Sequence, residues 1–158
     1  MKERLPFVSV VIPVRNEARY IEACLRSLLH GGYPAARLEI ILADGMSSDG
    51  TRESITRVMA ETAVPIRVID NPRGTIPCAL NLAIAEARGE IIIRADAHAR
   101  YPPDYVARCV RTLRRRGADN VGGPVTTEPG ADTVMARAIA LALSHPFGVG
   151  NSAFRTAK

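Results

Sequence analysis

Hydrophobic residues along the chain alternate between two kinds of spacing. Short runs rich in Ile, Val and Leu occur at 7–14, 38–43, 65–69 and 90–95, and each is typical of a buried strand. After each run, apolar residues recur three or four positions apart, which is the spacing of one helix face. The pattern therefore predicts a strand followed by a helix, four times over.

Residues that favour helix starts and turns separate these elements. Asn16 is expected to cap the first helix, the second has an apolar face around 55–59, and the third covers 79–87. The fourth helix begins after a Pro-Pro pair, since proline is tolerated in a first helical turn. Beyond it, a further strand over 119–125 and a helix over 133–144 are expected.

Strands that alternate with helices are joined by right-handed crossovers, so they form a mainly parallel sheet. The predicted fold class is therefore α/β, a doubly wound, mainly parallel sheet with helices on both faces. The chain has 158 residues, of which 47% are hydrophobic and only 4% aromatic. This length supports one substantial core, so residues 1–158 are predicted to form a single domain.

The charge and cysteine content narrow the choice of partners. The net charge is +5, with 21 basic residues that are mostly Arg, which suits an anionic ligand but equally a solvated helix surface. No nucleic-acid-binding motif accompanies this charge, so nucleic acid is not an expected partner. Cys24, Cys78 and Cys109 are far apart and odd in number, which predicts neither a disulfide framework nor a zinc cluster and favours a reducing compartment.

The sequence shows no membrane-spanning or secretory segment. Its N-terminal apolar run is too short for a signal peptide, and the apolar stretch VMARAIALALSHPF contains an Arg and is shorter than the roughly 20 residues of a membrane helix. We expect a cytoplasmic location, at or near the inner face of the cell membrane. Membrane association of a full-length protein remains open.

Parallel sheets bind ligands at the carboxyl ends of their strands, so the loops PVRNE, ADGMSSDGT and RADAHA are the candidates for a site. The first loop lacks GxGxxG, and no GxxxxGK occurs, which disfavours hydride transfer and P-loop phosphoryl transfer. Pro13, Val14 and Glu17 form a turn that could read the edge of a base or a ribose. Alternatively, Asn16 is only a helix cap and Glu17 only a first-turn acid.

The second and third loops contain carboxylates directly after apolar strands. Asp44 can accept hydrogen bonds from a nucleobase imide or a ribose hydroxyl, whereas Asp49 and Thr51 are better explained as caps of the next helix. Asp96 and His98, two residues apart at a strand end, are a workable pair of divalent metal ligands. Water or the oxygens of a diphosphate would complete the metal's coordination.

Three segments, VSVVIPVRNE, EIILADGMSSDGT and NPRGTIPCALNLAIAEARGEIIIRADAHARYPPDYV, resemble the family 2 glycosyltransferases in order and spacing. The resemblance extends over about residues 7 to 155 and implies the nucleotide-sugar-binding α/β fold called GT-A. The segments IRADAHARYPPDYV, VGGPV and HPFGVGNSAFR look like the subgroup linked to bacterial exopolysaccharide synthesis, similar to succinoglycan glycosyltransferases.

The resemblance implies a donor site for a nucleoside diphosphate sugar, with uridine as the expected nucleoside, and a bound Mn²⁺ or Mg²⁺. The residues implied to bind the donor are Pro13, Val14, Glu17, Asp44, Gly74, Asn81 and Asp96. Asp96 begins the family's metal-binding DxD motif. This sequence departs from the family at His98, in the motif's third position, and at Ala43, where another Asp is common.

Family members continue beyond this point with an acceptor-side segment that contains the catalytic base of an inverting reaction. The chain is thus expected to be the N-terminal, donor-binding part of a longer enzyme, with the base beyond Lys158 and the acceptor a glycan or a lipid-linked molecule. Arg73 and Arg94 could add charge near the diphosphate, or Arg94 could be a surface residue. Alternatives are a non-catalytic nucleotide-sugar-binding domain and a sugar nucleotidyltransferase, although PVRNEA lacks the glycine-rich loop of the latter.

Overall fold

The structure is a computed structural model and describes residues 4–150 and 152–156. The chain divides into two compact units, Met1–Arg114 and Arg115–Lys158. From the length alone we expect one domain. All the residues implied to bind donor or metal belong to the first unit, which contains the sheet.

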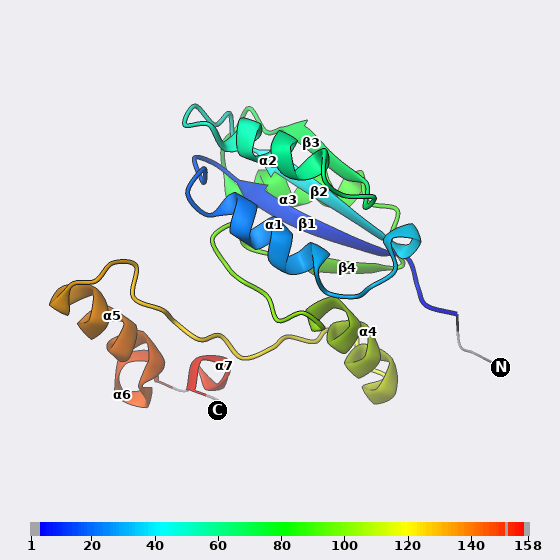
Figure 1. Cartoon of the computed structure of the whole chain (residues 1–158). Helices are drawn as coiled ribbons and strands as arrows, with labels where there is room; N and C mark the ends of the chain where they lie inside the picture. Colours follow the sequence, from blue (N-terminus) through cyan, green and yellow to red (C-terminus); the bar gives the residue numbers. More distant parts are fainter. Residues whose placement is uncertain (1–3, 151, 157–158) are drawn as a thin grey trace. The chain divides into compact units, whose positions relative to one another are not determined.

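The sheet of the first unit consists of parallel strands in the order β3-β2-β1-β4 among the described residues (Figure 1). The strands are β1 (Val8–Val14), β2 (Leu38–Asp44), β3 (Ile66–Asp70) and β4 (Ile91–Arg94). They confirm the four runs predicted from the sequence to within one or two residues. β1 lies between β2 and β4, so the order in which strands are added to the sheet changes direction beside β1. Parallel sheets bind ligands at such a position.

Helices cover both faces of the sheet, as the sequence predicts. Figure 1 shows α1 (Ile21–Leu29) and α2 (Thr51–Met59) side by side over one face, with α3 (Ile76–Ala85) behind the sheet. α4 (Tyr105–Arg116) contributes Val106 and Val110 to the same core as α1 and α2. A short 3₁₀ helix, η1 (Ala35–Arg37), leads into β2.

β1 and β2 contribute alternate residues to the two cores, because successive side chains point to opposite faces. The larger core, under α1, α2 and α4, is buried and mostly aliphatic; from β1 it includes Val8, Val10, Ile12 and Val14. On the other face the core is smaller and contains Val11, Ile41, Ala43, Ala79 and Ala83. The alanines of α3 let the helix approach the sheet closely.

Two local predictions are wrong. Asn16 does not cap α1: its φ is +54°, and the helix begins after Tyr20, which forms no side-chain cap hydrogen bond. Residues 119–125 do not form a strand. This segment includes Gly122, Gly123 and Pro124, which are poor strand formers, and within the described part of the second unit no strand is available to pair with it.

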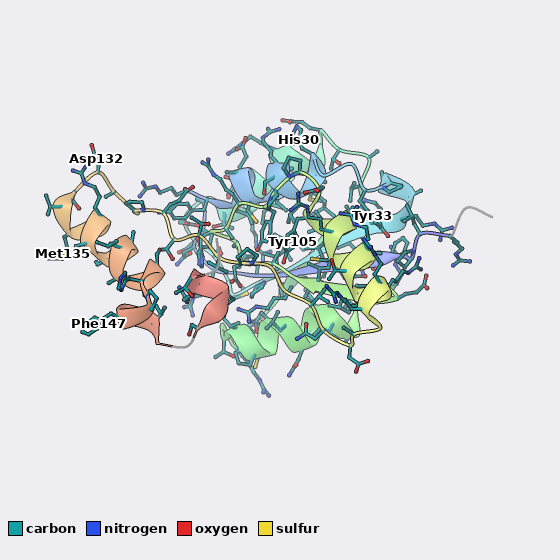
Figure 2. All side chains as sticks on the ribbon, turned by 90° about the horizontal axis from the view of Figure 1, so that it is seen from below. His30, Tyr33, Tyr105, Asp132, Met135 and Phe147 are labelled. Atoms are coloured by element: carbon teal, nitrogen blue, oxygen red, sulfur yellow. The ribbon has the colours of Figure 1, made fainter. Side chains whose placement is uncertain are left out.

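The second unit is helical in its described part. It contains α5 (Val134–Ser144), α6 (Pro146–Val149) and α7 (Ala153–Thr156). Thr133 caps α5 by accepting a hydrogen bond from the Ala136 N–H, which agrees with the predicted helix over 133–144. Figure 2 shows Phe147 projecting from α6, where it is 97% exposed. In the described part of the chain, no helix is long and apolar enough to cross a membrane.

A buried polar cluster lies at the amino end of the sheet. Glu39 is 1% exposed, and its carboxylate accepts hydrogen bonds from Ser9 Oγ at 2.7 Å and from the Arg88 N–H at 2.9 Å. Arg88 Nη2 also donates to this carboxylate, at 2.8 Å. Gly89 is required here, because a Cβ at this position would lie 2.5 Å from the Ser9 nitrogen. The cluster joins β1, β2 and the segment that enters β4.

Burial alone would raise the pKa of Glu39, but hydrogen bonds from Arg88 and Ser9 outweigh burial and hold this pKa below the usual value of a glutamate. A group whose pKa is lower in the folded than in the unfolded protein stabilises the fold above its unfolded pKa. That stabilisation is lost as the pH falls through the folded pKa.

We predict that Glu39→Gln lowers the free energy of unfolding by about 1–3 kcal/mol at neutral pH, because the charge-assisted bonds from Arg88 are weakened. The difference from wild type should shrink below about pH 4.3, as the wild-type carboxylate is protonated. Urea unfolding between neutral and acidic pH measures this, with Glu53→Gln on the exposed side of α2 as the control. A difference that is independent of pH would contradict the role of the carboxylate charge.

Candidate functional site

The candidate site is formed by the loops that follow the four strands at their carboxyl ends. The parallel register pairs Val14 with Asp44 and Asp44 with Asp70, so these strand ends lie at one edge of the sheet. Pro13 and Val14 end β1, Asp44 ends β2, and Asp96 follows β4 closely. The sheet therefore brings Pro13, Val14, Asp44 and Asp96 to the carboxyl ends of neighbouring strands.

Asp44 is fully buried, and its carboxylate is bonded within its own loop. Both carboxylate oxygens lie 3.2 Å from the Ser47 nitrogen, and Oδ1 also accepts from Ser47 Oγ. Arg52 Nε donates to Oδ2 at 2.6 Å, and Arg52 Nη2 pairs with Asp70. Asp44 thus fixes the loop after β2 and links it to α2 and the end of β3.

The loop after β1 is hydrogen-bonded to the loop after β2. The Asn16 N–H donates to Ser47 Oγ at 2.8 Å, and Asn16 Oδ1 accepts from the Ser48 N–H at 2.9 Å. Next along the chain, the Glu17 N–H donates to Thr51 Oγ1 at 2.8 Å. The two loops therefore form one hydrogen-bonded body.

The prediction that Asp49 and Thr51 cap the next helix is wrong in position, since the N-cap of α2 is Gly50, which has no side-chain cap hydrogen bond. Asp49 Oδ1 accepts from the Thr51 N–H at the start of α2, as a capping residue would. Its other oxygen accepts from the Ala18 N–H, at 3.1 Å, while Thr51 holds Glu17. A single sequence gives no signal of these contacts, since each depends on how the two loops meet.

Both loops contain a residue in the left-handed region, Asn16 at φ +54° and Met46 at φ +61°, which are the non-glycine residues with positive φ in the described chain. Such conformations are tolerated where surrounding contacts impose them, and they concentrate at functional sites. Asn16 adopts this region more readily than most residues, because its short side chain can hydrogen-bond locally.

Arg15 connects these loops to the loop after β3. Its Nη1 lies 3.5 Å from the Gly74 carbonyl oxygen. A Cβ on Gly74 would be 2.7 Å from Arg15 Nη1, and a Cβ on Gly45 would be 3.1 Å from the Arg15 side chain. Arg15 therefore lies across both glycines, and Gly74, with φ +66°, lies next to the loop after β1.

Asp96 and His98 lie beside Glu17, at the reversal of chain order between β1 and β4. His98 Nδ1 is 3.1 Å from Glu17 Oε1, and Arg94 Nη2 is 3.0 Å from Asp96 Oδ1. The Asp96 N–H donates to the Tyr101 hydroxyl at 2.7 Å, which fixes the start of the loop. Both Asp96 and His98 remain accessible, with side chains 47% and 63% exposed.

The pKa of the Cys24 thiol, on α1, is affected by the charges of this site. Burial, followed by the negative charges of Asp96 and Glu17, raises the pKa of the Cys24 thiol to about 12. The thiol also donates to the Asp96 carbonyl oxygen, at 3.5 Å. Both acids therefore lie close enough to this thiol to add to the effect of burial on its pKa.

The sequence profile of Glycosyl transferase family 2 matches residues 9–156. The chain belongs to the family 2 glycosyltransferases.

Among related proteins, the succinoglycan biosynthesis protein ExoA of Rhizobium meliloti (strain 1021) is 38% identical over 149 residues, which are 93% of this chain and 44% of ExoA. The mannosyltransferase PcManGT from Pyrobaculum calidifontis, solved in complex with GDP-Man and Mn²⁺, is 30% identical and superposes with a TM-score of 0.67 over 88% of this chain and 40% of its own. The chain spans less than half the length of the relatives it matches.

S. aureus TarS, solved with UDP, has the same fold at 19% identity, with a TM-score of 0.65 over 76% of this chain and 38% of TarS. The parallel 3-2-1-4 sheet with flanking helices is therefore the GT-A fold that the sequence predicts for this family member.

A divalent metal is implied by this glycosyltransferase fold, and the residues present fit one. Asp96 offers a carboxylate oxygen and His98 an imidazole nitrogen, a donor set that suits Mn²⁺ better than the all-oxygen preference of Mg²⁺. Within the described residues, no cluster of three His, Cys, Asp or Glu side chains could hold a metal by itself.

Asn81, a predicted donor residue, takes no part in the contacts described above. Asn81 is in the middle of α3, and its side chain is exposed. Pro13 is half-buried and Val14 is buried, so these two shape the floor of the site more than its surface.

We predict that Asn16→Ala lowers the free energy of unfolding by about 1–3 kcal/mol, because Ala adopts positive φ at a cost and cannot accept the bond from Ser48. Asn16→Gly should lose less, since it removes the same bond but tolerates this backbone conformation. Amide exchange should show faster opening at Ser48 in both variants. Equal stability of Asn16→Ala and Asn16→Gly would contradict the strain at this position.

Proposed function

We propose that this chain is the donor-binding part of an inverting, metal-dependent glycosyltransferase. It takes a nucleoside diphosphate sugar as donor, and the full-length enzyme transfers the sugar to a glycan or a lipid-linked acceptor in polysaccharide synthesis. The observation that carries the proposal is the contact of Glu17 with His98 at the strand reversal beside β1, where Asp96 belongs to the same loop as His98. Membership of the family and the likeness to ExoA support it.

The nucleoside is proposed to lie over the ends of β1 and β2. The surface there comes from the residues implied by the sequence, with Val14 and Asp44 beneath it. Because the carboxylate of Asp44 is already bonded to Ser47 and Arg52, its contribution is to hold these two residues in place. Arg15 and Gly74 bound the same region from the β3 side, and Asn81 is proposed to line it from α3.

The diphosphate is proposed to lie toward β4, where Asp96 and His98 hold the cation. Bound there, the cation would neutralise charge on the leaving diphosphate. Arg94 pairs with Asp96, so it can exchange that partner for a phosphate oxygen when the carboxylate binds metal. The base that deprotonates the acceptor hydroxyl is not assigned to a residue of this chain, and we propose that it belongs to the remaining length seen in the relatives.

Uridine is the nucleoside we propose first, as the sequence resemblance implies. Guanosine is the second candidate, because PcManGT was solved with GDP-Man and is 30% identical to this chain. Comparison of UDP with GDP in one calorimetric titration series distinguishes the two.

We predict that Mn²⁺ strengthens nucleoside diphosphate binding by tenfold or more, equivalent to about 1.4 kcal/mol. Asp96→Ala and His98→Ala should each lose this enhancement, whereas His98→Asp should keep it, because a carboxylate also ligates Mn²⁺. Titration calorimetry with UDP or GDP, with and without Mn²⁺, measures the effect.

Asp104→Ala is the matched control for this series, since Asp104 is an exposed acid that pairs with Arg108 outside the site. This variant should bind like wild type. Full Mn²⁺ enhancement in both Asp96→Ala and His98→Ala would remove these residues from the metal site and overturn the proposal.

A further inference from the structure

We propose that Glu17 is a positioning residue that fixes the tautomer and orientation of His98, so that His98 Nε2 is presented to the metal. This inference rests on the proposed function, because it assigns a role within the same donor site. It differs from the sequence-based expectation, in which Glu17 only surrounds the nucleoside.

The contact joins two loops that are far apart in sequence. Glu17 Oε1 and His98 Nδ1 are 3.1 Å apart and come from positions separated by 81 residues. Glu17 follows β1 and His98 follows β4, so the pair spans the boundary between the two neighbouring strands. Asp96, the other proposed metal ligand, belongs to the same loop as His98.

Glu17 is held more firmly than an ordinary surface acid. Its N–H donates to Thr51 Oγ1, and its carbonyl oxygen accepts from the N–H groups of Tyr20 and Ile21, each at 2.9 Å. Its side chain is 22% exposed, whereas that of His98 is 63% exposed. The more buried and better anchored partner of the pair is therefore the carboxylate, and the imidazole is the group that it can orient.

The hydrogen bond determines which imidazole nitrogen is available. An ionised carboxylate can only accept, so in this contact Nδ1 carries the proton and donates to Glu17. In a neutral imidazole the other nitrogen, Nε2, then has a free lone pair. Histidines that bind metals commonly donate their second ring nitrogen to a carboxylate, and loss of that carboxylate typically costs 10- to 100-fold in metal affinity (about 1.4–2.7 kcal/mol).

The same contact explains why a histidine is compatible with this position. A carboxylate at position 98 would face the carboxylate of Glu17 and be repelled in the absence of a cation. An imidazole turns Glu17 into a hydrogen-bond partner, so the metal site is oriented before the metal arrives.

The first test measures the tautomer without metal. Nitrogen-15 NMR of the histidine side chains at about pH 8, where free histidine is neutral, distinguishes a protonated Nδ1 from a protonated Nε2. Wild type should show His98 protonated on Nδ1, and Glu17→Ala should lose this preference. Glu17→Gln should keep most of it, because the amide oxygen accepts the same bond.

The two other histidines are internal controls in the same spectrum. His30, labelled in Figure 2, has Nδ1 2.6 Å from the Arg26 carbonyl oxygen and should stay protonated on Nδ1 in every variant. His145 Nδ1 accepts from the Phe147 N–H and should stay protonated on Nε2. Glu22→Ala, which removes a neighbouring acid of α1 that pairs with Arg26, should leave His98 unchanged.

The second test measures the metal. In an electron paramagnetic resonance titration with Mn²⁺ and UDP, Glu17→Ala should bind Mn²⁺ about 10- to 100-fold more weakly than wild type, and Glu17→Gln should lie between them. Electron spin-echo measurements should detect nitrogen-14 coupling to Mn²⁺ in wild type and a weakened coupling in Glu17→Ala.

The outcomes distinguish a failure of the positioning role of Glu17 from a failure of the proposed metal-dependent function. If His98 is not protonated on Nδ1 in wild type, or if Glu17→Ala changes the tautomer but neither Mn²⁺ affinity nor nitrogen coupling, the positioning role is wrong while the donor site stands. If wild type binds no Mn²⁺ with the nucleotide, the proposed metal-dependent function itself fails, and the positioning role fails with it.

Discussion

The position of β1 between β2 and β4 is the constraint on which the rest of the structure depends. Because both pairings are parallel, every loop that follows a strand emerges at the same edge of the sheet. Val8 is in register with Leu38 on one side and with Ile91 on the other. Two loops separated by about eighty residues are thereby placed within hydrogen-bonding distance, and Glu17 meets His98. The aliphatic cores on the two faces and the buried Glu39 cluster stabilise this arrangement at the opposite end.

At the carboxyl edge, backbone groups left free by the strand ends are satisfied by side chains from neighbouring loops. Among them, the carboxylate of Asp44 is fully buried, and a buried charge without partners is costly. Asp44 holds Ser47 and Arg52, Ser47 accepts from Asn16, and Thr51 accepts from Glu17. The network joins the loops after β1 and β2 in the absence of a ligand.

The sequence predicts the sheet well because its signals are local. Each strand is a short aliphatic run followed by a periodic helix, and the strand-end rule then places Asp44 and Asp96 at one edge. The contacts that build the site are not local. Neither the pairing of Asn16 with Ser48 nor that of Glu17 with His98 has a signal in a single sequence, since each depends on how two loops meet.

The missed elements have similar causes. Asn16 follows a strand and precedes an apolar periodic segment, which is typical of a helix cap. Its backbone is instead left-handed, and the helix begins only at Ile21. Within 119–125, Val121 and Val125 favour a strand, but Gly122, Gly123 and Pro124 between them do not, and a strand also needs a partner to pair with. Propensity therefore predicted the layers of the fold, while tertiary contacts decided the turns and the site.

The central claim is that Asp96 and His98 hold a divalent cation at the strand reversal, with Glu17 orienting the imidazole. The most direct measurement is anomalous diffraction at the manganese absorption edge, from crystals of this chain grown with Mn²⁺ and UDP. The account predicts one anomalous peak bonded to an Asp96 carboxylate oxygen and to His98 Nε2, with Nδ1 still facing Glu17. A nucleotide bound at this edge of the sheet with the manganese peak elsewhere, or with His98 turned away from it, would contradict the account.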